Sequence, residues 1–361
     1  MKKLIVEREK IIDNIKKLKA MTNTPIIATL KNNGYGLGLN EFPKLLLDNG
    51  IDFFAVATID EAIELRTNLP SSKIMMLHST AIEEEIFALL NNDVLPTIGS
   101  FESFDALNKI SKENNLPLYA QLKIDTGFGR FGFLPTDMIK LIDTLKANPN
   151  IGIVGTFSHF SSAFNEKNNY TEKQFNIFNK CISMLKDAGI EPGIEHICNS
   201  SSFLTKLHMH KDAVRIGSAL LGRILVTNSI ELNKIGYMLS SIEDIKVLPP
   251  NHFIGYSNTY KTKKETKIGV VPVGYLDGLE LKKGQDCFSP IDILREVYNK
   301  LKCFNKKIYV EIDNKKVPIL GKIGTNNIII DISEVDAKVG TLVKIDVNPM
   351  VVNPKIERVF I

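Results

Sequence analysis

The sequence predicts an α/β protein with an N-terminal (β/α)8 TIM barrel over residues 1–230 and a mainly β domain over residues 231–361. Three observations carry this prediction. Short apolar runs alternate with helical patterns between residues 26 and 216, polar residues end several of these runs, and the alternation stops after about Arg223. A chain of 361 residues is also long for one domain and sufficient for two.

The alternation begins after a short N-terminal section. Met1–Val6 reads as a strand that can pair with the β domain, and Arg8–Met21 reads as an amphipathic helix. The apolar runs that predict barrel strands are Ile26–Leu30, Phe53–Val56, Ile74–Leu77, Val94–Ile98, Tyr119–Ile124, Gly152–Phe157, Ile194–Cys198 and Ala213–Ile216. The helical patterns between them are Glu41–Leu47, Ile59–Arg66, Ile82–Leu90, Phe101–Ile110, Asp137–Leu145, Thr171–Ala188 and Ser201–Leu207.

Even spacing of these units favours a closed barrel over its main competitor, a doubly wound open sheet. The carboxyl ends of barrel strands meet at one mouth, where barrel enzymes place their chemistry. The polar residues at these ends are Lys31, Lys123, His159, Asn199 and Arg215. We therefore expect a functional site at this mouth.

The region after Arg223 predicts a second domain rich in β-strands. Gly, Pro and Asn turns separate its apolar runs, and only Ile291–Leu301 has a helical pattern. The predicted strands are Ser240–Val247, Lys267–Val273, Lys307–Ile312, Lys316–Leu320, Ile328–Ile332 and Thr341–Val347.

Composition excludes several other classes of protein. The net charge of +4 is spread along the chain, which gives no support to nucleic-acid or membrane binding. The four cysteines lack metal-ligand spacing, so we expect no metal site and reduced thiols. The N-terminus carries charges where a signal peptide needs an apolar core, and no apolar run approaches about 18 residues. We expect a cytoplasmic protein.

The stretch Ile26–Gly38 is the first candidate site. It reads I-I-A-T-L-K-N-N-G-Y-G-L-G, so a buried strand delivers Lys31 into a glycine-rich loop that contains Tyr35. A lysine there can form a Schiff base with a carbonyl or act as a base. A solvated lysine in a strand-to-helix turn is the alternative.

Further motifs follow later strands. The segment K-I-D-T-G-F-G-R-F-G-F places Lys123 and Arg130 around glycines, and its Asp125 can form a local ion pair with Arg130. The segment H-I-C-N-S-S holds Ser200, which can also be a plain helix N-cap. The segment V-R-I-G at Val214–Gly217 offers backbone N–H groups suited to a phosphate.

These segments, with S-H-F at His159, G-Y-S-N-T-Y at Tyr256 and G-Y-L-D-G at Tyr275, resemble the alanine racemase family in the same order. The family comprises fold-type III enzymes that depend on pyridoxal 5'-phosphate. The resemblance spans the chain. It implies an amino-acid racemase that interconverts L-alanine and D-alanine, supplies D-alanine to the cell wall and works as a homodimer with shared active sites.

The resemblance also implies roles for individual residues. Lys31 would bind the cofactor as a Schiff base and act on one face of the substrate, and Tyr256 of a second subunit would act on the other face. His159 would bridge Arg215 and Tyr256. The residues implied to hold the cofactor are Lys31, Tyr35, Arg130, His159, Asn199, Ser200, Arg215, Gly217 and Ser218. Lys123 matches a position that some members carry as a carbamate.

Substrate binding is implied for Arg130, Tyr275, Thr325 and Asn326, and here the chain departs from the family pattern. The family has a Met-Asp pair where this chain has Thr325 and Asn326. A phosphate-binding tyrosine near the C-terminus has no counterpart, and the stretch Leu281–Asn305 is longer than usual. A racemase for serine, lysine or ornithine, or one of broad specificity, is therefore one alternative. A second alternative is a protein that carries the cofactor without catalysis. A third is a decarboxylase of the same fold type, which would need an acidic partner for the pyridine nitrogen where this chain offers Arg215.

Overall fold

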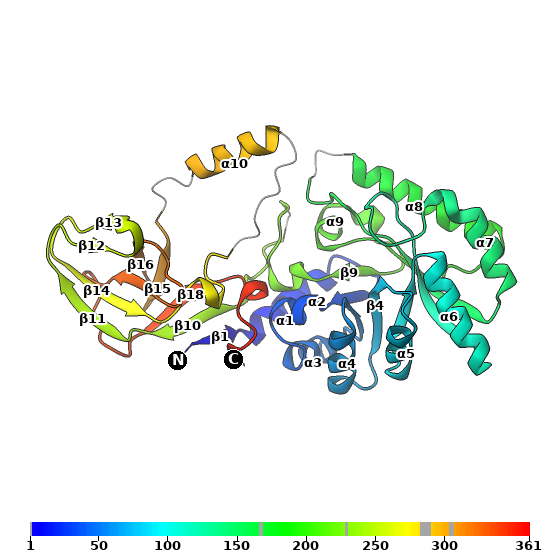
Figure 1. Cartoon of the computed structure of the whole chain (residues 1–361), viewed down its shortest axis with the longest axis horizontal. Helices are drawn as coiled ribbons and strands as arrows, with labels where there is room; N and C mark the ends of the chain where they lie inside the picture. The colour runs from blue at the N-terminus through cyan, green and yellow to red at the C-terminus, as the bar shows by residue number, and fades with distance from the viewer. Residues whose placement is uncertain (1, 166–168, 228–229, 282–289, 303–306) are drawn as a thin grey trace. The chain divides into compact units, whose positions relative to one another are not determined.

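The computed structural model describes residues 2–165, 169–227, 230–281, 290–302 and 307–361 (Figure 1). The chain forms two compact units, which we call the barrel unit (Arg8–Ile235) and the sheet unit (Met1–Glu7 with Gly236–Ile361). The polypeptide therefore passes between the units twice, after Glu7 and after Ile235. No helix of the described ranges combines the length and the apolar character that crossing a membrane requires.

Eight parallel strands form the barrel among the residues described. They are hydrogen-bonded in the order β8-β7-β6-β5-β4-β3-β2-β9, and a bridge from His196 to Ala213 joins the two ends of this order. The strands are β2 (Ile26–Thr29), β3 (Phe53–Val56), β4 (Lys73–Ser79), β5 (Leu95–Ile98), β6 (Leu118–Lys123), β7 (Ile151–Phe157), β8 (Ile194–His196) and β9 (Val214–Ile216). The predicted (β/α)8 barrel is confirmed.

Helices cover the outside of the barrel strands (Figure 1). They are α1 (Arg8–Lys19), α3 (Glu41–Asp48), α4 (Ile59–Asn68), α5 (Glu83–Asn91), α6 (Phe101–Asn114), α7 (Met138–Ala147), α8 (Tyr170–Asp187) and α9 (Ser200–Thr205), with α2 (Lys31–Tyr35) and the 3-10 turns η1 (Pro135–Asp137), η2 (Leu207–Met209) and η3 (Ser218–Leu221). Strands β2 and β3 are buried along their whole length, which explains why they read as continuous apolar runs. Ile27, Phe53, Met75 and Phe157 pack together in the barrel core.

The sheet unit holds a sheet of nine strands within the described ranges. Their order is β11-β14-β17-β16-β15-β18-β10-β1-β19. The strands are β1 (Lys3–Val6), β10 (Tyr237–Ser241), β11 (Asp244–Leu248), β14 (Thr266–Val271), β15 (Tyr309–Ile312), β16 (Lys315–Leu320), β17 (Ile328–Asp331), β18 (Leu342–Asp346) and β19 (Glu357–Phe360), and a separate hairpin joins β12 (Phe253–Ile254) to β13 (Tyr260–Lys261). Strand β1 lies between β10, its antiparallel neighbour, and β19, its parallel neighbour.

Two details of the sheet unit differ from the sequence prediction. The single strand predicted over Ser240–Val247 is wrong, because the chain leaves β10 at Ser241 and starts β11 at Asp244. Strand β10 pairs with β18 and strand β11 pairs with β14, so the chain bends between them to reach the second neighbour. Strand β19 was not predicted, since Glu357–Phe360 has charges at half of its positions.

The helix predicted over Ile291–Leu301 is present as α10 (Pro290–Lys302). Its apolar side chains are exposed, including Ile291, Leu294, Tyr298 and Leu301. The rest of the long Leu281–Asn305 stretch, including Cys287 and Cys303, lies largely outside the described residues. The other two cysteines, Cys181 and Cys198, are buried free thiols.

Candidate active site

Strand β2 and the turn that follows it position Lys31. The backbone is left-handed at four consecutive residues, with φ values of 54°, 54°, 61° and 55° from Asn32 to Tyr35. Asparagine and glycine tolerate this region better than other residues. The N–H of Asn33 also donates to the Glu61 carboxylate at 3.1 Å. The strand therefore ends abruptly, and Lys31 lies at the barrel mouth.

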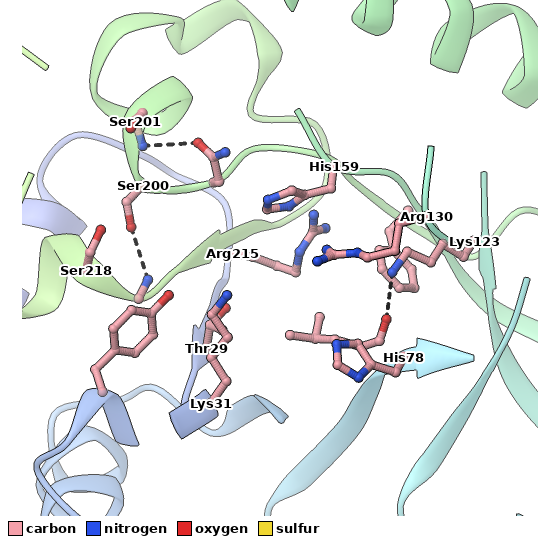
Figure 2. Close-up of a pocket in the computed structure, with 15 residues that line it drawn as sticks. Thr29, Lys31, His78, Lys123, Arg130, His159, Ser200, Ser201, Arg215 and Ser218 are labelled. Atoms are coloured by element: carbon pink, nitrogen blue, oxygen red, sulfur yellow. Dashed lines mark hydrogen bonds between the residues drawn. The ribbon is translucent and has the colours of Figure 1, made fainter. Parts of the chain in front are cut away.

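A cavity of about 220 Å³ lies at this mouth (Figure 2). Its lining residues are Thr29, Lys31, Tyr35, Leu77, His78, Lys123, Arg130, Phe157, His159, Asn199, Ser200, Ser201, Arg215, Gly217 and Ser218. Two lysines, two arginines and two histidines are among them, and this described lining contains no carboxylate. Such a wall favours an anionic ligand.

One end of the cavity is formed by hydroxyl and backbone N–H groups. The Ser200 hydroxyl accepts hydrogen bonds from the N–H groups of Gly217 at 3.1 Å and Ala219 at 3.2 Å. A Cβ atom on Gly217 would lie 2.5 Å from the ring of Tyr35, so only glycine allows this approach. The helix N-cap is Asn199 and not Ser200, because the Asn199 side chain accepts from the N–H groups of Ser201 and Ser202. These groups suit a phosphate.

Arg215 is fixed at the base of the cavity by acceptors around its guanidinium. It donates to the carbonyls of Ser158 and His196 and to the ring of His196, whose other nitrogen lies 3.1 Å from Gln121 Oε1. The guanidinium also lies 5.0 Å from the ring centre of Phe157. Burial lowers the pKa of Arg215 to about 10, which leaves it charged at neutral pH.

Lys123, the last residue of β6, and Arg130, in the loop that follows it, lie opposite the hydroxyl end (Figure 2). Lys123 Nζ donates to the Leu77 carbonyl at 2.7 Å. The Asp125 carboxylate accepts four backbone N–H groups, from Gly127 to Arg130, and so clamps the loop itself. The Arg130 guanidinium instead lies 4.4 Å from the ring centre of Phe128.

The cavity lowers the pKa of several basic groups. Burial and then the charge of Arg130 lower the pKa of Lys31, while Glu61 opposes the shift. Burial, Arg215 and Arg130 lower the pKa of Lys123 to about 7. Burial first, and the surrounding cations next, hold the pKa of His159 well below its usual value. Burial raises the pKa of Tyr35 to about 12. A larger fraction of Lys31 is thus neutral at pH 7 than of a solvated lysine.

The structure groups the sequence-predicted residues by unit. All those implied to hold the cofactor, and Lys123, line the cavity of the barrel unit. Tyr256, Tyr275, Thr325 and Asn326 belong to the sheet unit. There the Thr325 hydroxyl lies 3.2 Å from the Tyr275 hydroxyl, and Tyr256, in the 3-10 turn η4 (Tyr256–Asn258), is 70% exposed.

Sequence reasoning missed five lining residues: Thr29, Leu77, His78, Phe157 and Ser201. Four of these lie at or near the carboxyl ends of β2, β4 and β7. The strand-end argument that selected Lys123 could have selected His78 by the same signal. The apolar Leu77 and Phe157 carried no such signal, because the pattern reads them as core.

Comparison with known proteins assigns the family. The model "Alanine racemase, N-terminal domain" matches residues 6–224, and "Alanine racemase, C-terminal domain" matches residues 237–352. The chain belongs to the alanine racemase family. A curated alanine racemase of Methanococcus maripaludis is 30% identical over 94% of this chain and 87% of its own length.

Solved structures of alanine racemases share the fold. The enzyme of Clostridium difficile 630 aligns with a TM-score of 0.85 and 26% identity, over 100% of this chain and 95% of that one. The alanine racemase of Bartonella henselae, solved with covalently bound pyridoxal phosphate, aligns with a TM-score of 0.82 over 100% and 99% of the two chains. At 20% identity this second likeness shows the fold alone.

Proposed function

We propose that this protein is a pyridoxal 5'-phosphate-dependent racemase that interconverts L-alanine and D-alanine. The observation that carries the proposal is the amine of Lys31 in a cavity lined by cations and free of carboxylates in its described wall, in a chain of the alanine racemase family. The buried free thiols are typical of a reducing compartment, so we place the enzyme in the cytoplasm, where its D-alanine would supply the cell wall.

The cavity fits the cofactor by chemistry and shape. The phosphate would lie against Tyr35, Ser200, Gly217 and Ser218, where a side chain on Gly217 would collide with Tyr35. Arg215 would face the ring nitrogen and Arg130 the phenolic oxygen, with His159 and Asn199 beside them. The cofactor supplies an imine that delocalises the negative charge left when the substrate loses its Cα proton.

Lys31 would move a proton on one face of the substrate. Its lowered pKa raises the fraction of neutral amine at neutral pH, which a base requires. Arg215 would keep its own proton, because its guanidinium is fixed by Ser158 and His196 and its pKa of about 10 lies above neutral pH. The ring nitrogen therefore meets a fixed cation and not an acid, which favours racemisation over decarboxylation.

Tyr256 would move the proton on the other face. It is an exposed side chain of the sheet unit, and we propose that a second copy of the chain supplies it to the cavity in a homodimer. His159 would connect Tyr256 to Arg215. The substrate would contact Arg130 and three residues of the sheet unit, Tyr275, Thr325 and Asn326. The hydroxyls of Tyr275 and Thr325 lie within hydrogen-bond distance of each other.

The first experiment measures cofactor and proton exchange together. The purified protein should absorb visible light as a lysine-bound pyridoxal imine does, and should introduce Cα deuterium from heavy water into both enantiomers of alanine. Lys31→Ala should lose the absorbance and the exchange, while Lys146→Ala, an exposed lysine of α7, should keep both. A protein that binds the cofactor and exchanges no amino acid would contradict the proposal. If serine or lysine exchanged faster than alanine, the proposed substrate would be that amino acid instead.

A mixing experiment tests the shared site. Tyr256→Phe should lower racemisation by about 10²–10⁴-fold with the cofactor still bound, and Tyr309→Phe should not. If Tyr256 acts across a dimer, mixing Lys31→Ala with Tyr256→Phe gives heterodimers with one intact site, so activity should recover to about a quarter of the wild type. No recovery in a verified heterodimer, or a fully active monomer in sedimentation, would exclude sharing.

A further inference from the structure

His78 lies at the boundary between two cavities of the barrel unit. It is near the carboxyl end of β4, in the wall of the candidate active site. It also lines a second cavity of about 550 Å³, together with Ala57, Thr58, Ile59, Asp60, Met76, Ser79, Thr80, Glu85, Leu89 and Phe131. Among the described lining residues, His78 alone belongs to both cavities. Its side chain therefore forms part of the partition between them.

The His78 ring is connected to the two cations at this end of the site through one aromatic side chain. It stacks on Phe131, with ring centres 5.0 Å apart and planes inclined by 24°. The Phe131 ring centre is 5.1 Å from Lys123 Nζ and 5.8 Å from Arg130 Cζ. An aromatic ring that stacking holds in place attracts the cations near its face.

The backbone provides a second connection. Lys123 Nζ donates to the carbonyl of Leu77, the residue that precedes His78. Figure 2 shows Lys123 and His78 at the end of the cavity opposite Ser200 and Ser218. Lys123 is only 5% exposed, and its amine has Phe157 as a further ring neighbour at 5.0 Å. The Phe131 ring, which lies against both His78 and Lys123, lines the second cavity as well.

The charges around both groups have one dominant sign. Lys31, Lys123 and Arg130 face His78, with Glu61 as the opposing carboxylate, and burial is the largest cause that lowers the pKa of His78. Arg215 and Arg130 face Lys123, with Asp125 opposing. A neutral ring can close this end of the cavity without adding another positive charge.

We propose that His78 is a positioning residue of the active site, whose ring, held on Phe131, closes the cavity opposite Ser200 and keeps water from Lys123. The inference rests on the proposed function only in so far as Lys123 and Arg130 belong to the racemase site. The shielding of Lys123 by the His78 ring does not depend on catalysis.

The test measures how the reactivity of the Lys123 amine depends on pH. The full-length chain, freed of cofactor and kept in buffer purged of carbon dioxide, is pulsed with acetic anhydride across a range of pH. Mass spectrometry then measures the labelling of the peptide that carries Lys123. Wild type should show a midpoint near pH 7. His78→Ala should raise it by about one pH unit or more, because water stabilises the charged amine.

Two further variants separate shielding from other effects. His78→Phe keeps a flat ring that can stack on Phe131, so its midpoint should stay within about 0.3 pH units of wild type. His208→Ala removes an exposed histidine from beside Phe175 and should change nothing. If His78→Ala does not fold by circular dichroism, His78→Gln replaces it, since glutamine cannot stack as a ring does.

A midpoint in folded His78→Ala or His78→Gln equal to that of wild type would overturn the proposal, as would a shift in His78→Phe as large as in the ring-less variant. This readout needs neither cofactor nor turnover. A protein that fails to racemise alanine could still show the predicted shift, and an active racemase could fail to show it.

Discussion

At the scale of single residues, burial of a charged side chain in the cavity lowers the stability of the folded protein. Lys123 is buried, and its amine donates a hydrogen bond to a neutral carbonyl, that of Leu77. Its pKa falls from 10.5 to about 7 on folding. Between about pH 7 and pH 10.5, Lys123 is protonated in the unfolded chain and neutral in the folded chain. The free energy of unfolding therefore rises with pH over this range. Below about pH 7 both states are protonated, and the cost of burial is complete.

Replacing Lys123 with methionine should therefore stabilise the cofactor-free barrel unit most at low pH. We expect a gain of roughly 2 kcal/mol at pH 6, after the loss of the hydrogen bond to Leu77, and no gain by about pH 10. Thermal unfolding of wild type and Lys123→Met across this range, in buffer free of carbon dioxide, measures the difference. A gain that does not depend on pH would contradict the assignment of the cost to the charge.

Gly217 shows how closely the backbone approaches a side chain, the ring of Tyr35, at the hydroxyl end of the cavity. Gly217→Ala should displace Tyr35, weaken pyridoxal phosphate binding by about tenfold or more, and lower stability by roughly 1–3 kcal/mol. Gly189→Ala is the matched control. Gly189 has a φ of +76° and open space around it, so alanine there should cost about 1 kcal/mol and leave cofactor binding unchanged. Fluorescence titration with the cofactor measures both affinities, and equal affinities would refute the steric argument.

At the scale of elements, the turn after β2 determines where Lys31 lies. The sequence predicted that a strand delivers a lysine into a glycine-rich loop, because the apolar run and the glycines are local signals. It did not predict that Asn32, Asn33 and Tyr35 would also adopt left-handed backbone, or that the Tyr35 ring would lie against Gly217, 182 residues further along the chain. The contact from Asn33 N–H to Glu61, 28 residues away, has no local signal either.

This turn predicts a difference between two substitutions at Asn33. Asn33→Gly should be neutral within about 0.5 kcal/mol, because glycine adopts φ of +54° freely. Asn33→Val should cost about 2 kcal/mol, because a β-branched side chain is a strong outlier there. Since Lys31 begins this turn, Asn33→Val should also lower kcat more than Asn33→Gly. Denaturant unfolding and racemisation of both variants measure the effects, and equal stabilities would show that the left-handed backbone is not required.

At the scale of the whole molecule, the N-terminal segment belongs to the unit formed by the C-terminal third of the chain. Residues 3–6 form an inner strand of the sheet unit, next to the edge strand β19, and Leu4 and Val6 are fully buried. The barrel could be predicted from its alternation because each β–α unit is local. Pairing of β1 with β10 and β19 joins residues more than 200 positions apart. The sequence could therefore suggest that β1 pairs with the β domain, but it could not identify the two neighbouring strands.

Truncation of Leu4 should therefore destabilise the sheet unit and not the barrel unit. Leu4→Ala should lower the stability of the sheet unit by about 2–5 kcal/mol, while cofactor binding in the barrel unit should hardly change. Ile293→Ala, on the exposed face of α10, should cost less than about 0.5 kcal/mol. Thermal unfolding with and without cofactor separates the unfolding transitions of the two units. A lower transition temperature of the barrel unit in Leu4→Ala would contradict the assignment of β1 to the sheet unit.

The position of β1 also sets the order of events during synthesis. This strand leaves the ribosome long before its neighbours, because β10 begins at residue 237 and β19 at residue 357. At about 5–20 residues per second, the strand waits tens of seconds for its neighbours. All barrel strands emerge within that interval, so the barrel can close while the apolar strand β1 is still unpaired. A chaperone that binds extended apolar segments would have its best opportunity at these first residues.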